Sequence, residues 1–300
     1  MTYAVETEKL NYTAGRGEKA FHVTDLSLHV PKGAVFGFLG ANGSGKTTTF
    51  RLLLALLKPD SGRITVLGES MPEEYVSVLA KTGYVPERPH VYPSLTVREA
   101  IDLHRTFYPT WDQKWADELL GEFNLVLDRK QSALSKGEAG KLQMLLALSQ
   151  RPELLVLDEP TDGLDPVVRR DLLSALLAYV NDTQATVLIS SHLVHELERI
   201  CDWIGLMDHG NLLVEMPMQE FKNGIKRLRL ASAPADLSNA PFTLLSREEE
   251  SNGSQQWLVR GWTDGMHEFF TGRGATVREV VDLDLEEGFV EILRSSRANR

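Results

Sequence analysis

Residues 35–47 read Val-Phe-Gly-Phe-Leu-Gly-Ala-Asn-Gly-Ser-Gly-Lys-Thr, an apolar run that leads directly into the pattern G-x-x-x-x-G-K-[ST]. The apolar run predicts a buried strand, and the pattern predicts a loop whose backbone N–H groups surround a phosphate chain. A helix from about Gly45 to Leu57 should follow, with the positive end of its dipole at the same anion. The stretch therefore predicts a strand, a phosphate-binding loop and a helix.

The side chains of this loop have separate expected roles. We expect Lys46 to neutralise the β and γ phosphate oxygens and Thr47 to place its hydroxyl on Mg²⁺. A glycine-rich turn could match the pattern by chance, but the strand and helix on either side argue against this alternative. The expected nucleotide contacts are Gly40, Ala41, Asn42, Gly43, Ser44, Gly45, Lys46, Thr47 and Thr48.

The composition limits the class of protein. The chain has 300 residues, of which 42% are hydrophobic, enough for one large or two modest globular domains. Its richest apolar run, residues 52–57, is far shorter than the ~18 residues of a membrane span. The first residues lack the basic start and apolar core of a secretory signal, so we expect none. A net charge of −10 predicts no general attraction to nucleic acid or anionic lipid.

Two other features favour structural roles. Cys201 is the only cysteine, so no internal disulfide is possible, and we expect a small buried side chain. His192, His195 and Glu196 form a His-x-x-His-Glu run that suggests zinc as an alternative. Adjacent acidic and histidine residues are common on helices, so we do not favour a metal site there.

The pattern of apolar residues predicts the organisation of residues 1–220. Residues 3–30 alternate and contain turns, which indicates a small antiparallel sheet before the phosphate-loop strand. Residues from about 95 to 150 show helical periodicity and predict a helical insert. The short runs at 154–157 and 186–189, separated by an amphipathic helix, predict buried parallel strands. The expected fold is therefore an α/β phosphate-loop core with a mixed sheet, an N-terminal antiparallel β-subdomain and an inserted helical subdomain.

Residues 221–300 predict a separate small α+β accessory domain. The polar run 247–254 is expected to be a solvated hairpin loop. The expected strands lie near 227–230, 243–245, 257–259 and 276–280, and the expected helices lie near His267 and Phe289.

A pair of carboxylates follows the apolar run at 154–157. A buried strand that ends in Asp158-Glu159 would deliver both side chains beside the phosphates. Asp158 is suited to hold Mg²⁺ through its water shell, whereas Glu159 would accept a proton from the attacking water. The two carboxylates should therefore have different tasks.

Four more stretches complete an ordered set of motifs. They are Gly-Tyr-Val-Pro-Glu at 83–87, Leu-Ser-Lys-Gly-Glu at 134–138, Pro-Thr-Asp-Gly-Leu-Asp at 160–165 and Ser-Ser-His at 190–192. With the phosphate loop and the Asp-Glu pair, this order over about residues 3–220 resembles the nucleotide-binding subunit of ATP-binding cassette (ABC) transporters. The stretch at 107–112 and the extra C-terminal domain are similar to exporter-type subunits whose permease is encoded separately.

The resemblance implies roles for residues around the nucleotide. Tyr12 stands where the family places an aromatic residue that stacks on adenine. His192 stands where the family has a histidine that contacts the γ-phosphate. Glu87 replaces a glutamine that reaches Mg²⁺ and the attacking water, which keeps an oxygen ligand but adds negative charge. The resemblance thus implies Glu159, His192 and Glu87 as catalytic residues and Thr47, Asp158 and Glu87 as metal ligands.

Other residues are implied to contact the ATP of a partner subunit. From the residues alone, the stretch at 134–138 predicts a serine cap before a helix, and Asp165 predicts a helix N-cap before Pro166. In the family the first stretch caps the γ-phosphate in trans, with a glycine where this chain has lysine and a glutamine where it has glutamate. The implied trans contacts are Ser135, Lys136, Gly137, Glu138 and Asp165.

The resemblance implies an ATP hydrolase that uses ATP and Mg²⁺ and dimerises around two ATP molecules. A separate permease would hold it at the cytoplasmic side of the membrane, with export as the direction of transport and no nucleic acid as partner. The alternative is a soluble ABC-type ATPase that acts on ribosomes or DNA, but its relatives carry two cassettes, long coiled coils or basic surfaces. A GTPase would need N-K-x-D, and residues 57–60 lack the asparagine.

Overall fold

The computed structural model describes residues 2–15, 17, 20–89, 92–234, 236–249 and 253–298. The chain divides into two compact units. The first unit contains Met1–Leu193 and Trp203–Glu215, and the second contains Val194–Asp202 and Met216–Arg300. A short segment that precedes the last strands of the first unit therefore belongs to the second unit.

The centre of the first unit is a six-stranded sheet in the order β11-β10-β4-β9-β8-β7. Strands β10, β4, β9, β8 and β7 pair in parallel, so their carboxyl ends lie at one edge of the sheet. At this edge β4 ends just before the predicted phosphate loop, β8 ends at Asp158 and β9 ends at Ser191. The strands are β4 (Val35–Leu39), β7 (Thr82–Val85), β8 (Leu154–Asp158), β9 (Thr186–Ser191), β10 (Trp203–Asp208) and β11 (Asn211–Pro217).

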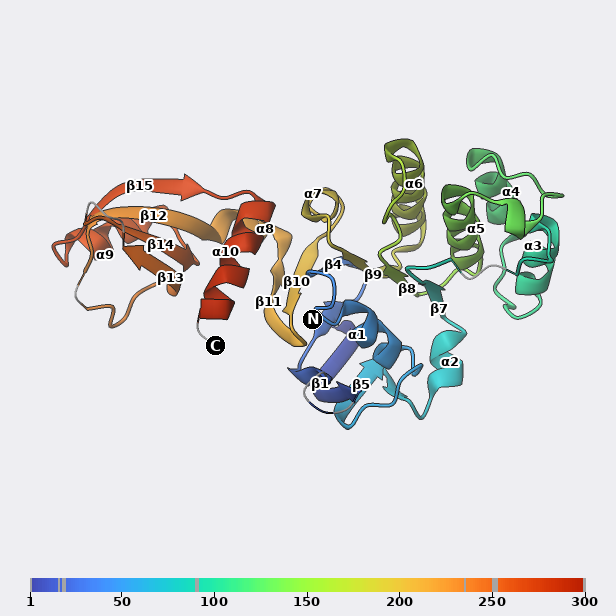
Figure 1. Cartoon of the computed structure of the whole chain (residues 1–300), viewed down its shortest axis with the longest axis horizontal. Helices are drawn as coiled ribbons and strands as arrows, with labels where there is room; N and C mark the ends of the chain where they lie inside the picture. Colours follow the sequence, from blue (N-terminus) through green and yellow to red (C-terminus); the bar gives the residue numbers. More distant parts are fainter. Residues whose placement is uncertain are drawn as a thin grey trace. The chain divides into compact units, whose positions relative to one another are not determined.

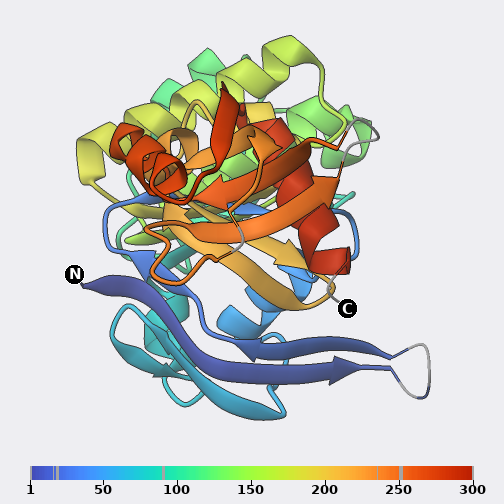
Figure 2. The ribbon, with the colours of Figure 1, turned by 90° about the vertical axis from the view of Figure 1, so that its left-hand side faces the viewer.

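A second sheet of the first unit confirms the predicted N-terminal antiparallel subdomain. Its order is β2-β1-β5-β6, and β3 also pairs with β1. Figure 2 shows the long neighbouring strands β1 and β2 in dark blue. The strands are β1 (Tyr3–Ala14), β2 (Phe21–Leu26), β3 (His29–Pro31), β5 (Ser61–Val66) and β6 (Glu69–Met71), followed by helix α2 (Tyr75–Leu79).

Helix α1 (Lys46–Leu53) follows the phosphate loop but is shorter than predicted. We expected it to continue to Leu57, which was wrong. Ala55 takes a left-handed conformation with φ of 54°, and the N–H groups of Leu56 and Leu57 both return to the carbonyl of Arg51. This local turn ends the helix after two turns.

The predicted helical insert consists of α3 (Val97–Arg105), α4 (Gln113–Glu122) and α5 (Lys136–Ser149), with a 3₁₀ turn at Gln131–Ala133. Helix α5 packs against α3, α4 and α6 (Pro166–Thr183), as Figure 1 shows in green. Each of the three insert helices begins at a side-chain cap, namely Thr96, Asp112 and Ser135. These polar side chains accept hydrogen bonds from backbone N–H groups that have no partner within the first turn of the helix.

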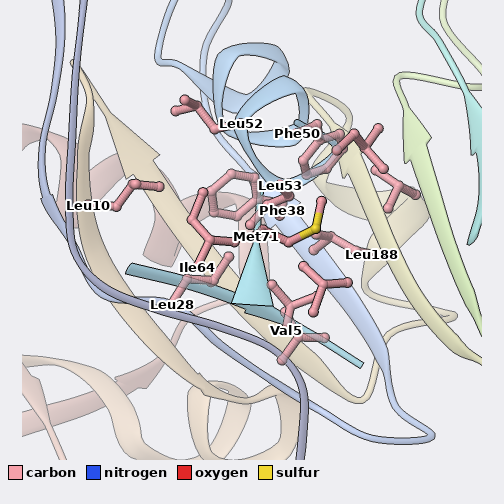
Figure 3. Packing of buried hydrophobic residues seen from close by; sticks show 14 of the residues in the cluster. Val5, Leu10, Leu28, Phe38, Phe50, Leu52, Leu53, Ile64, Met71 and Leu188 are labelled. Carbon is pink, nitrogen blue, oxygen red and sulfur yellow. The ribbon is translucent and has the colours of Figure 1, made fainter. Parts of the chain in front are cut away.

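A hydrophobic core holds α1 between the two sheets. Phe50 and Leu53 of α1 pack into a buried cluster with Phe38 of β4 and Ile64 of β5 (Figure 3). Fully burying side chains of this size stabilises a fold by about 1.5–3 kcal/mol each. The core therefore fixes α1, and with it the loop that precedes its first residue.

The second unit has a small α+β fold. Its antiparallel sheet has the order β13-β14-β12-β15. Trp257 and Phe270 centre its hydrophobic core. Its elements are α7 (Val194–Leu197), α8 (Met218–Gly224), β12 (Ile225–Ser232), β13 (Thr243–Glu249), β14 (Gln255–Arg260), a 3₁₀ turn (Asp264–Met266), α9 (His267–Thr271), β15 (Thr276–Asp282) and α10 (Leu285–Ala298).

No helix in the described part of the chain combines the length and the apolar character that crossing a bilayer requires.

Candidate nucleotide-binding site

The loop between β4 and α1 borders a cavity of about 530 Å³. Gly40 is required at its start, because a Cβ there would lie 2.4 Å from Ser44 Oγ and 2.6 Å from the Met207 carbonyl oxygen. Gly45 has φ of 115°, a conformation that side chains rarely adopt. The cavity is lined by Phe21, Asn42, Gly43, Gly45, Lys46, Thr47, Thr48, Glu87, Glu159, Asp162 and His192.

The structure brings together most of the predicted nucleotide and catalytic residues at this cavity. Asp158 lies beneath it, fully buried and bonded to Thr47. Other predicted residues are not among those that line it, namely Tyr12, Gly40, Ala41, Ser44, Ser135, Lys136, Gly137, Glu138 and Asp165.

Lys46 is a buried cation at the base of the cavity. Its side chain is 5% exposed, and its Nζ donates to the Gly40 carbonyl oxygen at 2.7 Å. Nζ also lies 3.1 Å from Glu159 Oε1. The ammonium is therefore held at the mouth of the phosphate loop by its own loop and by one carboxylate.

Asp158 ends β8 and offers an oxygen to a cation. Its Oδ1 accepts from Thr47 Oγ1 at 3.1 Å and from Ser190 Oγ at 2.9 Å. Its Oδ2 is buried without a hydrogen-bond partner among the described atoms. Burial raises the pKa of Asp158, and the charges of Glu159 and Glu87 add to this effect.

These features fit a divalent cation. An unpartnered buried carboxylate oxygen with a raised pKa is stabilised by a nearby positive charge, and Thr47 and Glu87 supply further oxygens at the same cavity. Within the described residues, no three His, Cys, Asp or Glu side chains already form a metal cluster. Mg²⁺ commonly takes one or two carboxylates and completes its shell with water and phosphate, so the donor set suits Mg²⁺.

Glu159 is the first residue after β8 and has φ of 48°. This left-handed conformation costs a non-glycine residue of order 1–3 kcal/mol, and such strain is typical of functional sites. The backbone N–H of Glu159 donates to Ser190 Oγ at 2.9 Å. This contact anchors the turn that points the carboxylate into the cavity.

His192 follows β9 and pairs with Glu159. Its backbone N–H donates to Glu159 Oε2 at 3.2 Å, and its Nδ1 lies 2.8 Å from the same oxygen. Its Nε2 lies 3.9 Å from Asp162 Oδ1. The imidazole therefore lies between two carboxylates at the edge of the cavity.

The predicted serine cap at the start of α5 is confirmed. Ser135 Oγ accepts from the Glu138 N–H at 3.2 Å, and Glu138 Oε2 accepts from the Ser135 N–H at 2.8 Å. The Ser135 N–H lowers the pKa of Glu138, and the nearby Arg129 guanidinium lowers it further. The glutamate of this motif is thus engaged within its own subdomain.

Asp165 is confirmed as the N-cap of α6. Its Oδ1 accepts from the N–H groups of Val167 and Val168 at 3.0 and 3.1 Å, and Pro166 is the first residue of the helix. Three residues earlier, Asp162 lines the cavity, although the sequence analysis did not select it. The polar position next to the Pro-Thr turn was its only signal.

Phe21 is the second residue that the sequence analysis missed. Both Tyr12 and Phe21 pack against the hydrophobic core cluster, but of the two only Phe21 lines the cavity. In the β1–β2 pairing, Tyr12 lies opposite Val23 and Phe21 lies opposite Ala14, so the two aromatic residues share one face. Phe21 is farther along this hairpin, a position that depends on the register and not on local sequence.

The chain is similar in sequence to several known proteins. A family model described as ABC transporter matches residues 23–162. YcbN of Bacillus subtilis (strain 168), an uncharacterized ABC transporter ATP-binding protein, is 38% identical over 224 residues, which cover 74% of this chain and 72% of YcbN. The bacitracin transport ATP-binding protein BcrA of Bacillus licheniformis is 34% identical, with coverage of 74% and 72%. The linearmycin resistance ATP-binding protein LnrL of Bacillus subtilis (strain 168) is 35% identical, with coverage of 68% and 66%.

Solved structures agree with the predicted fold. One ATP-binding subunit of an ABC transporter has a TM-score of 0.65 at 26% identity, with coverage of 74% of this chain and 92% of that chain. A dimeric ATP-binding cassette in a post-hydrolysis state, bound to ADP and Pi, has a TM-score of 0.65 at 22% identity, with coverage of 71% and 98%. At that identity the second match establishes the shared fold alone.

Proposed function

Because this chain belongs to the ABC transporter family as an ATP-binding and ATP-hydrolysing subunit, we propose that it dimerises around two ATP molecules and drives a separate membrane permease. The observation that carries the proposal is the cluster of Lys46, Glu159 and His192 at the phosphate-loop cavity. A cation for the phosphates and a base beside it are the parts that phosphate-anhydride hydrolysis needs.

Each residue of the cluster then has a task in hydrolysis. Lys46 and the loop N–H groups bind the β- and γ-phosphates of ATP, and these phosphates displace the Glu159 carboxylate from Lys46. Glu159 orients the attacking water and takes its proton, and His192 contacts the γ-phosphate. Mg²⁺, held through Asp158, Thr47 and Glu87, would supply charge neutralisation at the β- and γ-phosphates.

The dimer is supported by the position of the motif that begins α5. The cavity is lined by its own phosphate loop, while Ser135 and Gly137 are not among its lining residues. The N-terminus of α5 presents backbone N–H groups and a positive dipole end, which suit a phosphate. A second copy of the chain would bring this helix end to the γ-phosphate, with Asp165 in the same interface, and close two equivalent sites.

The permease is supported by an exposed aromatic groove in the first unit. A cavity of about 350 Å³ is bordered by Tyr92, Phe107 and Tyr108, and the Phe107 side chain is 69% exposed. Exposed apolar groups of this kind indicate a protein contact. The resemblance to ABC subunits also implies a permease contact around residues 88–92, of which residues 90 and 91 lie outside the described residues. The permease would place the subunit at the cytoplasmic side of the membrane.

Export is the direction that we propose. BcrA is named for bacitracin transport and LnrL for linearmycin resistance, and both names fit the removal of a compound from a cell. The alternative, an ABC-type ATPase acting on ribosomes or DNA, has less support, because the chain contains one phosphate loop and carries a net charge of −10.

The test is a pull-down from detergent-solubilised membranes of the source cells. The bait is the Glu159→Gln variant with ATP, because the amide keeps the shape of the side chain but cannot act as a base. Lys46→Ala with ATP is the matched control, since it should not close. Recovery of a multi-span protein with the first bait alone supports the proposal, whereas recovery of ribosomes or DNA would favour the alternative.

A further inference from the structure

Lys136, the lysine that replaces a family glycine, forms an ion pair within its own chain. Its Nζ lies 3.3 Å from Asp162 Oδ2, and both side chains are about half exposed. Asp162 Oδ1 lies 3.9 Å from His192 Nε2, whose ring in turn contacts Glu159, the partner of Lys46. Basic and acidic side chains therefore alternate from the start of α5 to the base of the phosphate loop.

The Lys136 ammonium lies against the loop that carries Asp162 and Gly163. Gly163 has φ of 63°, and a Cβ at this residue would lie 2.6 Å from Lys136 Nζ. The loop thus leaves room for the ammonium beside its own backbone. Because Glu138 is engaged by Ser135 and Arg129, Asp162 is the carboxylate that neutralises Lys136.

Lys136 occupies a place that disfavours a lone cation. It is the first residue of α5, where the helix dipole presents its positive end. A lysine there is stabilised only when an anion is held close by. The same place would therefore bind an anion of higher charge more strongly than it binds a carboxylate.

We propose that Lys136 is a catalytic cation for the ATP of the partner subunit, and that Asp162 of its own subunit holds it until the dimer closes. This inference rests on the proposed dimer. When the dimer closes, the γ-phosphate, which carries more negative charge than Asp162, replaces the Asp162 carboxylate as the partner of the Lys136 ammonium. Asp162 is then a positioning residue that makes closure depend on a competing phosphate.

The relative strengths favour this exchange. A half-exposed ion pair such as that of Lys136 and Asp162 contributes little, so its loss changes an equilibrium by about two- to fivefold. A charge-assisted contact with a phosphate in a closed interface is worth about ten- to a hundredfold. The phosphate therefore displaces Asp162, and the ion pair still sets the ATP concentration at which closure occurs.

The experiment is a double-mutant cycle on the full chain, with turnover and dimerisation measured against ATP concentration. Lys136→Met should lower kcat by about ten- to a hundredfold, and Lys136→Arg should restore most of it. Asp162→Asn should lower the ATP concentration for half-maximal dimerisation by about two- to fivefold. In the Lys136→Met background, Asp162→Asn should no longer lower this concentration, because its effect acts through the lysine.

Lys114→Met on α4 is the matched control, because its side chain is 89% exposed and lies outside the site. Melting temperatures of all variants separate loss of function from loss of folding. The inference would be overturned if Lys136→Met turned over ATP at the wild-type rate. It would also be overturned if Asp162→Asn lowered the ATP concentration for half-maximal dimerisation equally in the Lys136→Met background. Failure of the wild type to dimerise or hydrolyse ATP would instead contradict the proposed function.

Discussion

The ammonium of Lys46 lies 3.1 Å from the carboxylate of Glu159, and both side chains are at least nine-tenths buried. The proposed base therefore neutralises the phosphate-binding cation before ATP arrives. ATP must replace this carboxylate at Lys46, and the displaced carboxylate is then free to approach the attacking water. The same pair thus connects nucleotide binding with the release of the base.

Glu159→Gln should abolish turnover and keep ATP binding. The amide cannot take a proton from water, and it no longer competes with ATP for the Lys46 ammonium, so the affinity should not fall. Gel filtration with ATP should show a stable dimer, and Glu153→Gln, at an exposed surface position, is the control. Full turnover in Glu159→Gln would refute the role of this residue as base.

Lys46→Ala should weaken ATP binding by about ten- to a hundredfold, because a charge-assisted phosphate contact of about 1.5–3 kcal/mol is lost. Isothermal titration calorimetry measures this change directly. Lys58→Ala, at an exposed position after α1, removes the same charge and should leave the affinity unchanged. An unaltered affinity in Lys46→Ala would show that the nucleotide binds elsewhere.

Phe21→Ala should weaken ATP binding by about two- to tenfold, since this ring lines the cavity and an aromatic contact contributes about 0.5–1.5 kcal/mol beyond burial. Tyr12→Ala should mainly lower the melting temperature, because Tyr12 packs against the hydrophobic core but does not line the cavity. Titration with a fluorescent ATP analogue compares the two variants. The opposite ranking would restore Tyr12 as the residue that stacks on adenine.

Asp112→Ala should destabilise the protein by about 1–2 kcal/mol, since Asp112 caps α4 and pairs with Arg151 at 2.7 Å. The Trp115 N–H, followed by the Arg151 guanidinium, lowers the pKa of Asp112. A lowered folded pKa means that this contribution is present above the unfolded value of about 3.9 and is lost as the pH falls through the folded pKa. Urea unfolding should therefore show a constant difference between wild type and variant near neutral pH that shrinks only in strong acid.

Thermal stabilisation by Mg²⁺ in the presence of ATP should weaken on acidification. Burial raises the pKa of Asp158, so this carboxyl takes up its proton at a higher pH than the usual value of about 3.9. A divalent cation competes with that proton. Melting curves recorded from neutral pH into the acid range measure the decrease, and Asp158→Asn should remove the part due to Asp158. An increment that does not change with pH in the wild type would contradict this ligand.

The sequence predicted best where a motif fills one local turn. The phosphate loop depends on glycine conformations, the Asp158-Glu159 pair on the end of a strand, and the Ser135 cap on the start of a helix. Each of these motifs lies within a few residues. The fold followed from the alternation of strands and helices. The order of these elements then brought Lys46, Glu159 and His192 to one sheet edge.

Features set by distant parts of the chain were missed. Whether Tyr12 or Phe21 lines the cavity depends on where each residue lies along the β1–β2 hairpin, and no local sequence pattern encodes this position. The pair of Lys136 and Asp162 joins residues 26 positions apart from different elements. Helix α1 ends early because Ala55 adopts a left-handed conformation. No glycine or asparagine stands at this position to indicate such a conformation in the sequence.

The segment Val194–Asp202 begins two residues after His192 and folds with the second unit, after which the chain returns to the first unit at Trp203. Lys222 pairs with Glu198 of this segment at 3.0 Å, and α10 packs against α7. Removing residues 216–300 would leave Val194–Asp202 without these partners. The second unit thus includes a segment that lies within the sequence of the first unit. Gaining or losing this unit in evolution would require remodelling the chain next to His192.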